Sequence, residues 1–182
     1  MPTPAALISC VAPGHRPNII TLGECYMLAL EPLVVGISIR PRRYSHRLIS
    51  ESREFVVNFP TADLAAAVDY CGMASGADVD KFAASGLTPE PADVVAAPLI
   101  RECPLNLECR VRDVLKMGSH DVFVGDVVAT HVEDWALDES GQLDPVRARA
   151  IAFIGRSYWA VGPQVERAFV RRRPAESETE RR

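Results

Sequence analysis

The sequence lacks most of the features that would assign it to a class at once. No apolar run approaches the roughly 20 residues that a membrane helix requires. The N-terminus has no basic segment followed by an apolar stretch, so we expect neither a signal peptide nor a membrane as partner. The five cysteines form no Cys-x-x-Cys pair, which argues against a zinc knuckle and a disulfide framework. Reduced, buried thiols in a cytoplasmic protein fit this pattern best.

Glycine-rich cofactor loops are missing too. There is no Gly-x-Gly-x-x-Gly, no Gly-x-x-x-x-Gly-Lys-Ser/Thr and no Gly-x-Ser-x-Gly. These absences argue against a Rossmann dinucleotide site, a P-loop and a serine hydrolase elbow. The four histidines have no metal-ligand spacing, so we expect no metal site. The net charge of −4 argues against nucleic acid as a partner, because phosphate binding needs a basic face.

What is present is the composition of one soluble domain. The chain has 182 residues, of which 48% are hydrophobic and 24% charged, and this length favours a single domain. We expect that domain to span residues 1–163. From residue 164 onward, arginine and glutamate clusters follow one another without glycine, which predicts a helical or disordered tail over 164–182.

Hydrophobic periodicity predicts a mainly β fold with inserted helices. We expect strands near 5–11, 18–22, 33–39, 55–59, 105–111, 122–132, 151–154 and 158–161. The continuous apolar run 33–39 predicts a strand covered on both faces, and the alternation in 105–111 predicts a half-buried strand. Helices are expected at 44–52, with Ser45 as N-cap, and at 62–73, with Thr61 as cap. Residues 87–98 read as a loop, and the whole pattern fits a closed barrel with helical additions.

A third, short helix is expected after the turn Ser75-Gly76, with Asp78 and Asp80 in its first turn. Lys81 follows, and it is the only lysine within thirty residues on either side. A lysine is a compact point charge that suits a phosphate or the anionic edge of a ring. Lys81 could therefore face a cofactor; the alternative is a surface lysine paired with a neighbouring aspartate.

Four other residues have the chemistry to bind an anion: Asn18, Thr21, Arg40 and Ser45. The N-terminus of a helix presents free backbone N–H groups, to which a hydroxyl and an arginine can add. The alternative is that Ser45 only caps its helix and Arg40 is solvated. Asn58 lies inside a strand and could bond to the polar edge of a ring, or equally to a neighbouring loop.

His120 follows a glycine turn at Gly118-Ser119. It could position a nicotinamide or donate a hydrogen bond to a substrate, because histidine titrates near neutrality. The alternative is an ordinary polar histidine in a hairpin turn.

Read together, these segments resemble the flavin reductase-like family of FMN-binding split barrels, in its flavoredoxin-like branch. The similarity runs from about residue 5 to 162, and its order and spacing carry it. The matching segments include Asn18-Ile-Ile-Thr21, Pro32-Leu-Val-Val-Gly-Ile-Ser-Ile39, Tyr44-Ser45, Phe55-Val-Val-Asn-Phe-Pro60, Ser75-Gly-Ala-Asp-Val-Asp-Lys-Phe82 and His120-Asp-Val-Phe-Val-Gly125.

The resemblance implies a split-barrel homodimer that holds FMN and exchanges electrons with NADH or NADPH. By that resemblance, Asn18, Thr21 and Ser45, with Arg40 nearby, would hold the phosphate and ribityl chain. Asn58, Ser75, Gly76 and Lys81 would lie along the isoalloxazine ring, His120 would meet the nicotinamide, and either Tyr158 or Trp159 would cover the ring. The electron acceptor would be a small molecule or a protein.

Two positions depart from the family pattern. Many members have aspartate where this chain has Ser119, and many have tryptophan where this chain has Glu24. The main hypothesis is hydride transfer from NAD(P)H to flavin and on to an acceptor. The missing acid at Ser119 favours a second hypothesis, an FMN electron carrier without NAD(P)H turnover. A third is a ligand-binding barrel that has lost its flavin.

Overall fold

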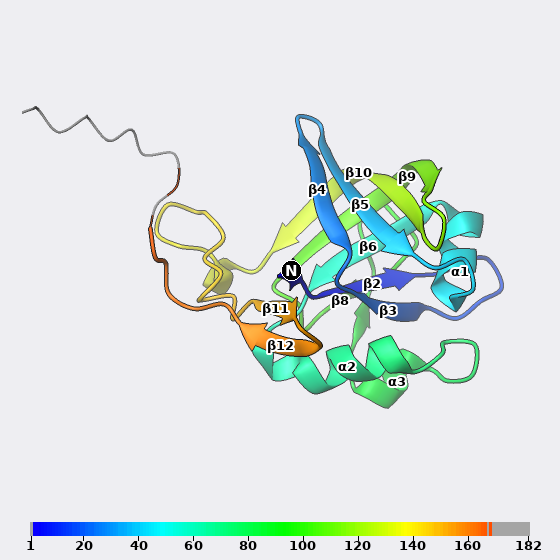
Figure 1. The fold of residues 1–182 in the computed structure, drawn as a ribbon, viewed down its shortest axis with the longest axis horizontal. Coiled ribbons are helices and arrows are strands. Elements are labelled where there is room, and N and C mark those ends of the chain that lie inside the picture. Colours follow the sequence, from blue (N-terminus) through cyan, green and yellow to red (C-terminus); the bar gives the residue numbers. More distant parts are fainter. Residues whose placement is uncertain (1, 167, 169–182) are drawn as a thin grey trace, which may run out of the picture.

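Seven antiparallel strands form the one large sheet in the computed structural model, which describes residues 2–166 and 168 (Figure 1). The strand order is β3-β2-β6-β9-β10-β5-β4. The strands are β2 (Ala6–Cys10), β3 (Asn18–Leu22), β4 (Cys25–Leu30), β5 (Leu33–Ile39), β6 (Glu54–Phe59), β9 (Leu105–Lys116) and β10 (Asp121–Val132). The mainly β prediction is confirmed. The closed barrel is not, because the sheet curls into a half-barrel whose edges are β3 and β4.

Helices cover both faces of this sheet, which explains its continuous apolar strands. On one face, Ile8 and Phe123 pack with Ile49 of α1 (Tyr44–Ser52). On the opposite face, Leu7 packs with residues of α2 (Ala65–Met73) and α3 (Lys81–Ser85). Successive residues of a strand point to opposite faces, so a strand covered on both sides is apolar at successive positions and does not alternate with polar residues.

The helix ranges were predicted better than their caps. Helix α1 has the predicted bounds, but Arg43 occupies the N-cap position and Ser45 is the second helical residue. The predicted helix 62–73 divides into a 3₁₀ turn, η1 (Ala62–Leu64), and α2, and Thr61 makes no side-chain cap bond. Helix α3 begins at Lys81, where the Asp80 carboxylate accepts the backbone N–H of Ala83. Asp78 therefore precedes the helix, contrary to our prediction.

The start of strand β9, residues 106–109, is buried on both faces where alternation predicted one polar face, whereas Arg110 and Arg112 are exposed as predicted. Asn106 and Glu108 are buried, and Glu108 is fully buried. The loop between β7 (Pro89–Glu90) and β8 (Leu99–Ile100) covers Glu108, whose carboxylate accepts the backbone N–H groups of Asp93, Val94 and Val95. The predicted loop 87–98 is thus confirmed except for the two residues of β7.

Strand β4 was not predicted, and it forms with β5 a hairpin that extends beyond the rest of the sheet (Figure 1). Its apolar side chains are exposed, among them Tyr26, Met27, Leu28 and Leu30. A separate sheet joins β1 (Thr3–Pro4), β11 (Ile151–Ile154) and β12 (Ser157–Ala160), and the 3₁₀ turn η2 (Asp134–Ala136) lies between β10 and β11 in the chain.

Most of the predicted tail lies outside the described residues, and 164–166 form neither helix nor strand. Among the described helices, none combines the length and the apolarity that crossing a membrane requires.

Candidate functional site

Two adjoining cavities lie along the edge strand β3, where α1 begins and where the chain connects α2 to α3. The first encloses about 130 Å³ and the second about 250 Å³. Both are lined by Ile20, Arg43 and Gly72, so they form one groove. The first is also lined by Arg42, Tyr44, Ser45, Ala74, Ser75, Gly76 and Lys81, and the second by Thr21, Leu22, Glu24, Ser38, Ile39, Arg40 and His120.

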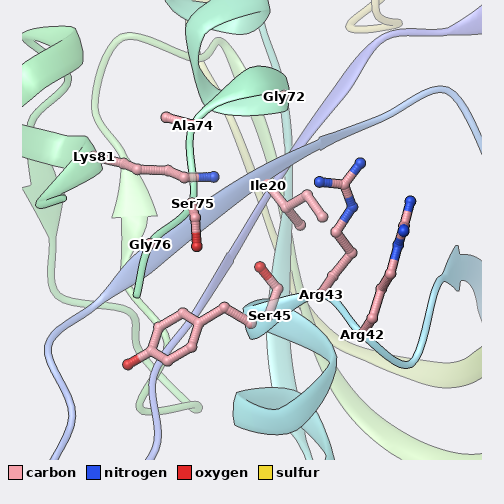
Figure 2. Close-up of a pocket in the computed structure, with 10 residues that line it drawn as sticks. Ile20, Arg42, Arg43, Ser45, Gly72, Ala74, Ser75, Gly76 and Lys81 are labelled. Atoms are coloured by element: carbon pink, nitrogen blue, oxygen red, sulfur yellow. The ribbon is translucent and has the colours of Figure 1, made fainter. Parts of the chain in front are cut away.

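Lys81 is the buried cation of the first cavity, and its ammonium points into it (Figure 2). Nζ donates to the carbonyl oxygens of Ile19 and Cys71, each at 2.7 Å. Burial lowers the pKa of Lys81, since desolvation penalises the charged form. The alternative of a surface lysine paired with an aspartate is therefore wrong. Two carbonyls hold two of the three N–H groups of the ammonium, which leaves one for a ligand.

Ser45 lines the first cavity and pairs with Asn18, a predicted cofactor residue that itself lines neither cavity. The Asn18 amide donates to Ser45 Oγ at 2.7 Å, and both side chains are buried. Asn18 Oδ1 has no partner, which is unusual for a buried polar atom. Ser45 Oγ accepts from Asn18, and its own hydroxyl has the buried Cys10 thiol as a neighbouring partner. Figure 2 shows this oxygen directed toward Ser75 across the cavity.

Gly76 lets the chain pass close to this pair. A methyl group at Gly76 would lie 1.8 Å from Asn18 Oδ1 and 3.1 Å from the Tyr44 ring, so no side chain fits there without movement. Arg16 also bonds the Gly76 carbonyl oxygen at 3.2 Å and fixes this segment. The turn Ser75-Gly76 thereby forms one wall of the cavity, as the sequence suggested.

The first cavity is electropositive. Arg42 and Arg43 extend along its other side, just before α1 (Figure 2). Of the described residues that line it, none is acidic. The first N–H groups of α1 have no intrahelical partners, and the helix dipole adds partial positive charge there. These features together favour an anionic ligand. Arg42, Arg43 and Tyr44 were missed as site residues, although the cluster Arg40-Pro-Arg-Arg43 was visible in the sequence.

His120 lies at the second cavity, on the turn between β9 and β10. Arg40 Nε donates to His120 Nε2 at 3.2 Å, and Ser119 Oγ lies 2.8 Å from His120 Nδ1. The next residue, Asp121, pairs at 2.8 Å with His46 in the first turn of α1. This pair connects the histidine turn to the helix that borders the first cavity.

The structure does not bring every predicted residue to the groove. Thr21 lines the second cavity, although its hydroxyl donates to the Val68 carbonyl at 2.5 Å. Asn58 lines neither cavity. Its amide nitrogen bonds the Leu7 carbonyl and Ser9 Oγ, and its oxygen accepts the Ile100 N–H. The alternative of a strand asparagine bonded to its neighbours is the one the structure has.

Tyr158 and Trp159 also lie away from the groove. Tyr158 packs against Phe153 in the three-stranded sheet, and Trp159 is exposed and bonds the Ile154 carbonyl. Within this chain, neither aromatic ring borders the two cavities.

One group of potential metal ligands lies elsewhere, formed by Asp93, Glu108 and His131. The histidine spacing gave no sign of it, because its members come from a loop and two strands. The Glu108 oxygens already accept three backbone N–H groups, and His131 Nε2 lies 2.7 Å from one of them. This arrangement anchors the loop on the sheet, and the lone pairs that a metal would use are occupied.

The comparisons with known proteins agree with this architecture. The model of the family described as flavin reductase like domain matches residues 1–158. The structure of flavoredoxin from Desulfovibrio vulgaris (Miyazaki F) superposes with a TM-score of 0.87 at 30% identity, covering 92% of this chain and 91% of that one. The structure of flavoredoxin from Methanosarcina acetivorans gives 0.85 at 32% identity, covering 92% and 89%.

A sequence relative has a described activity in its name. The NADH:riboflavin 5'-phosphate oxidoreductase of Streptomyces pristinaespiralis is 25% identical over 132 residues, which are 72% of this chain and 72% of that protein.

Proposed function

Because the chain belongs to the flavin reductase-like domain family, a family of split-barrel proteins, we propose that it binds FMN in the groove along β3. We further propose that it is an oxidoreductase that uses NADH or NADPH as the hydride donor. The name of the Streptomyces pristinaespiralis relative supports this donor. The names of the two flavoredoxins support the flavin.

The observation that carries the proposal is the first cavity. It combines two arginines, a buried lysine and a helix N-terminus with no acidic side chain among the described lining residues. The phosphate of FMN needs such a donor set. The residues present therefore fit the cofactor.

Each side chain has a role that its position suggests. Ser45, Arg42, Arg43 and the first N–H groups of α1 would hold the phosphate. Lys81 would give its remaining N–H to the polar edge of the ring, where a cation stabilises the reduced, anionic form. When bound, FMN supplies the hydride and electron chemistry. His120 lies at the adjoining cavity, where it would orient the nicotinamide.

A second function is favoured by one observation. Ser119, and not a carboxylate, contacts His120 Nδ1, so no carboxylate orients the ring. An FMN electron carrier that does not oxidise NAD(P)H would have no need for such a carboxylate.

We propose also that the chain forms a homodimer in the cytoplasm. The exposed apolar side chains of β4 lie on an edge strand, which is a surface that a second copy can cover. All five cysteines are free and buried, and unpaired thiols persist in a reducing compartment. The electron acceptor would be a small molecule or a protein partner.

One experiment tests the function. Purified protein is mixed with FMN, freed of excess and titrated anaerobically with NADH and with NADPH while absorbance is recorded. A flavin spectrum that bleaches supports the reductase and names its donor. Bound flavin that stays oxidised supports the electron carrier. Protein that takes up no FMN and does not accelerate its reduction by either nucleotide would refute both.

A further inference from the structure

We infer, on the basis of the proposed function, that His46 is a positioning residue for hydride transfer: it holds the turn between β9 and β10, and with it His120, against the first turn of α1. His46 itself lines neither cavity. His120 lies on an exposed turn, where a side chain that is to orient a nicotinamide needs support from the rest of the fold.

Among the described side-chain hydrogen bonds and ion pairs, two join residues 117–121 to the rest of the chain. One is the 3.2 Å bond between Arg40 Nε and His120 Nε2, whose side chains are exposed. The other is the pair of His46 Nε2 and Asp121 Oδ2 at 2.8 Å, whose side chains are only 16% and 13% exposed. A bond to a carboxylate is stronger than one between neutral groups, and it is stronger still away from water. The His46–Asp121 bond is therefore the main support of the turn.

The orientation of the His46 ring is fixed as well. The ring stands edge-on to that of Phe123, with the two centroids 5.0 Å apart at 68°, and Phe123 is fully buried on β10. An ionised carboxylate only accepts hydrogen bonds, so His46 Nε2 carries a hydrogen whether the ring is neutral or protonated. Helix α1 thus contacts β10 at Asp121 and at Phe123, directly after the turn.

The first turn of α1 serves the cofactor on one side and the histidine turn on the other. Arg43, Tyr44 and Ser45 line the first cavity, where the phosphate of FMN would bind. The next residue, His46, reaches Asp121 instead. The same helix turn therefore sets the distance between the cofactor and His120. A misplacement of about 1 Å can cost about 100-fold in rate, so losing this support should affect hydride transfer more than FMN binding.

The test replaces His46 in the full-length protein. Leucine keeps apolar bulk against Phe123 and removes the donor, whereas glutamine can place an N–H near the position of Nε2. We expect His46→Leu to lower kcat/KM for NADH or NADPH at least about tenfold and to leave the dissociation constant of FMN within about threefold. His46→Gln should recover most of the loss. Ser50→Ala is the matched control and should change neither quantity, because Ser50 Oγ lies 3.5 Å from Nδ1, the ring nitrogen that does not bind Asp121.

A second measurement does not depend on turnover. The Met117 amide donates to the His120 carbonyl at 2.9 Å within the turn, so its hydrogen exchange, followed by NMR without FMN, reports how often the turn opens. His46→Leu should speed this exchange about tenfold or more. Asp121→Ala should have the same effect, and the double variant should add nothing to it, because both changes remove one bond.

Three results would overturn the inference: unchanged Met117 exchange in both His46→Leu and Asp121→Ala, a loss of FMN affinity as large as the loss of kcat/KM, or a glutamine variant as impaired as the leucine variant. Failure of the proposed function looks different. Wild-type protein that binds FMN but oxidises neither nucleotide would refute the reductase, and Met117 exchange would still decide whether His46 holds the turn.

Discussion

At the scale of single residues, Lys81 provides the sharpest test of the cofactor site. Its ammonium is fixed by two carbonyl oxygens and faces the first cavity. Losing a hydrogen bond to a charged group costs about 1.5–3 kcal/mol, so Lys81→Met should raise the dissociation constant of FMN about 10- to 100-fold. Fluorescence titration of FMN measures this change.

The control for Lys81 is the only other lysine in the sequence, Lys116, which is exposed near the β9–β10 turn. Lys116→Met removes the same charge and should leave FMN affinity unchanged. Lys81→Met also leaves two buried carbonyl oxygens without their hydrogen-bond donor. Thermal unfolding of both variants without FMN therefore shows whether the fold survives. A folded Lys81→Met protein with unaltered FMN affinity would mean that Lys81 does not contact the cofactor.

Glu108 is a residue whose burial determines how stability depends on pH. Burial alone would raise its pKa, but the bonds from His131 and from the backbone of residues 93–95 outweigh it and lower the pKa below the ordinary 4.5. A carboxyl group with a depressed folded pKa stabilises the protein above pH 4.5, and this contribution is lost as the pH falls toward the folded value.

Glu108→Gln should therefore destabilise the protein at pH 7, by about 1–3 kcal/mol for the N–H groups left without a full acceptor. The difference from wild type should shrink as the pH falls from about 4.5 toward the lower pKa of the folded carboxyl, because the unfolded wild-type chain takes up a proton at Glu108 first. Urea unfolding at pH 7 and pH 4 measures both effects. Glu139→Gln, at an exposed glutamate, should change neither. A difference that stays constant with pH would contradict the assigned direction of the shift.

At the scale of elements, the connection between α2 and α3 depends on the absence of a side chain at Gly76. An added methyl group would lie 1.8 Å from Asn18 Oδ1, so Gly76→Ala must displace Asn18 or the turn itself. We expect FMN affinity to fall about tenfold or more, since the polar pair with Ser45 would separate. The matched control is Gly162→Ala, because no atom lies within 4 Å of the added methyl group there. Equal FMN affinity in both variants would show that this close packing is not required.

The elements show where sequence patterns suffice. Runs such as 18–22 and 33–39 were predicted with their correct bounds, because β-branched residues in short apolar stretches report burial directly. Strand β4 was missed although it is also a short apolar run; its side chains after Cys25 are exposed and a bulge near Met27 shifts its register, so apolarity does not report burial there. The burial of Glu108 could not be predicted, because the loop that covers it lies about fifteen residues away in the chain and makes its contacts only in three dimensions.

In the candidate site, too, some residues could be predicted from the sequence and others could not. The resemblance grouped Ser45, Ser75 and Lys81 in one site, and the structure places all three around one cavity, which no single motif could predict. The resemblance also assigned Asn58 to the ring, but its partners lie in the strands β2 and β8 and bond both the nitrogen and the oxygen of its amide. Pairings across the sheet, which no local pattern contains, decide such cases.

At the scale of the whole molecule, the β4–β5 hairpin provides the test of assembly. Tyr26, Met27, Leu28 and Leu30 are exposed on an edge strand, where their contact with water is unfavourable. If a second copy covers this strand, Met27→Asp places a charge in the interface, and an unpaired buried charge costs several kcal/mol. We expect the variant to shift from dimer to monomer in sedimentation at micromolar concentration.

Met117 makes a matched control for this substitution. It is 66% exposed, against 63% for Met27, but it lies in the β9–β10 turn and not on β4. Met117→Asp should leave the dimer intact, because the same charge then stays in water. A wild-type protein that sediments as a monomer would refute the homodimer. Equal dissociation of both variants would contradict an interface at β4, because the dimer would then be lost through the added charge itself and not through its position on β4.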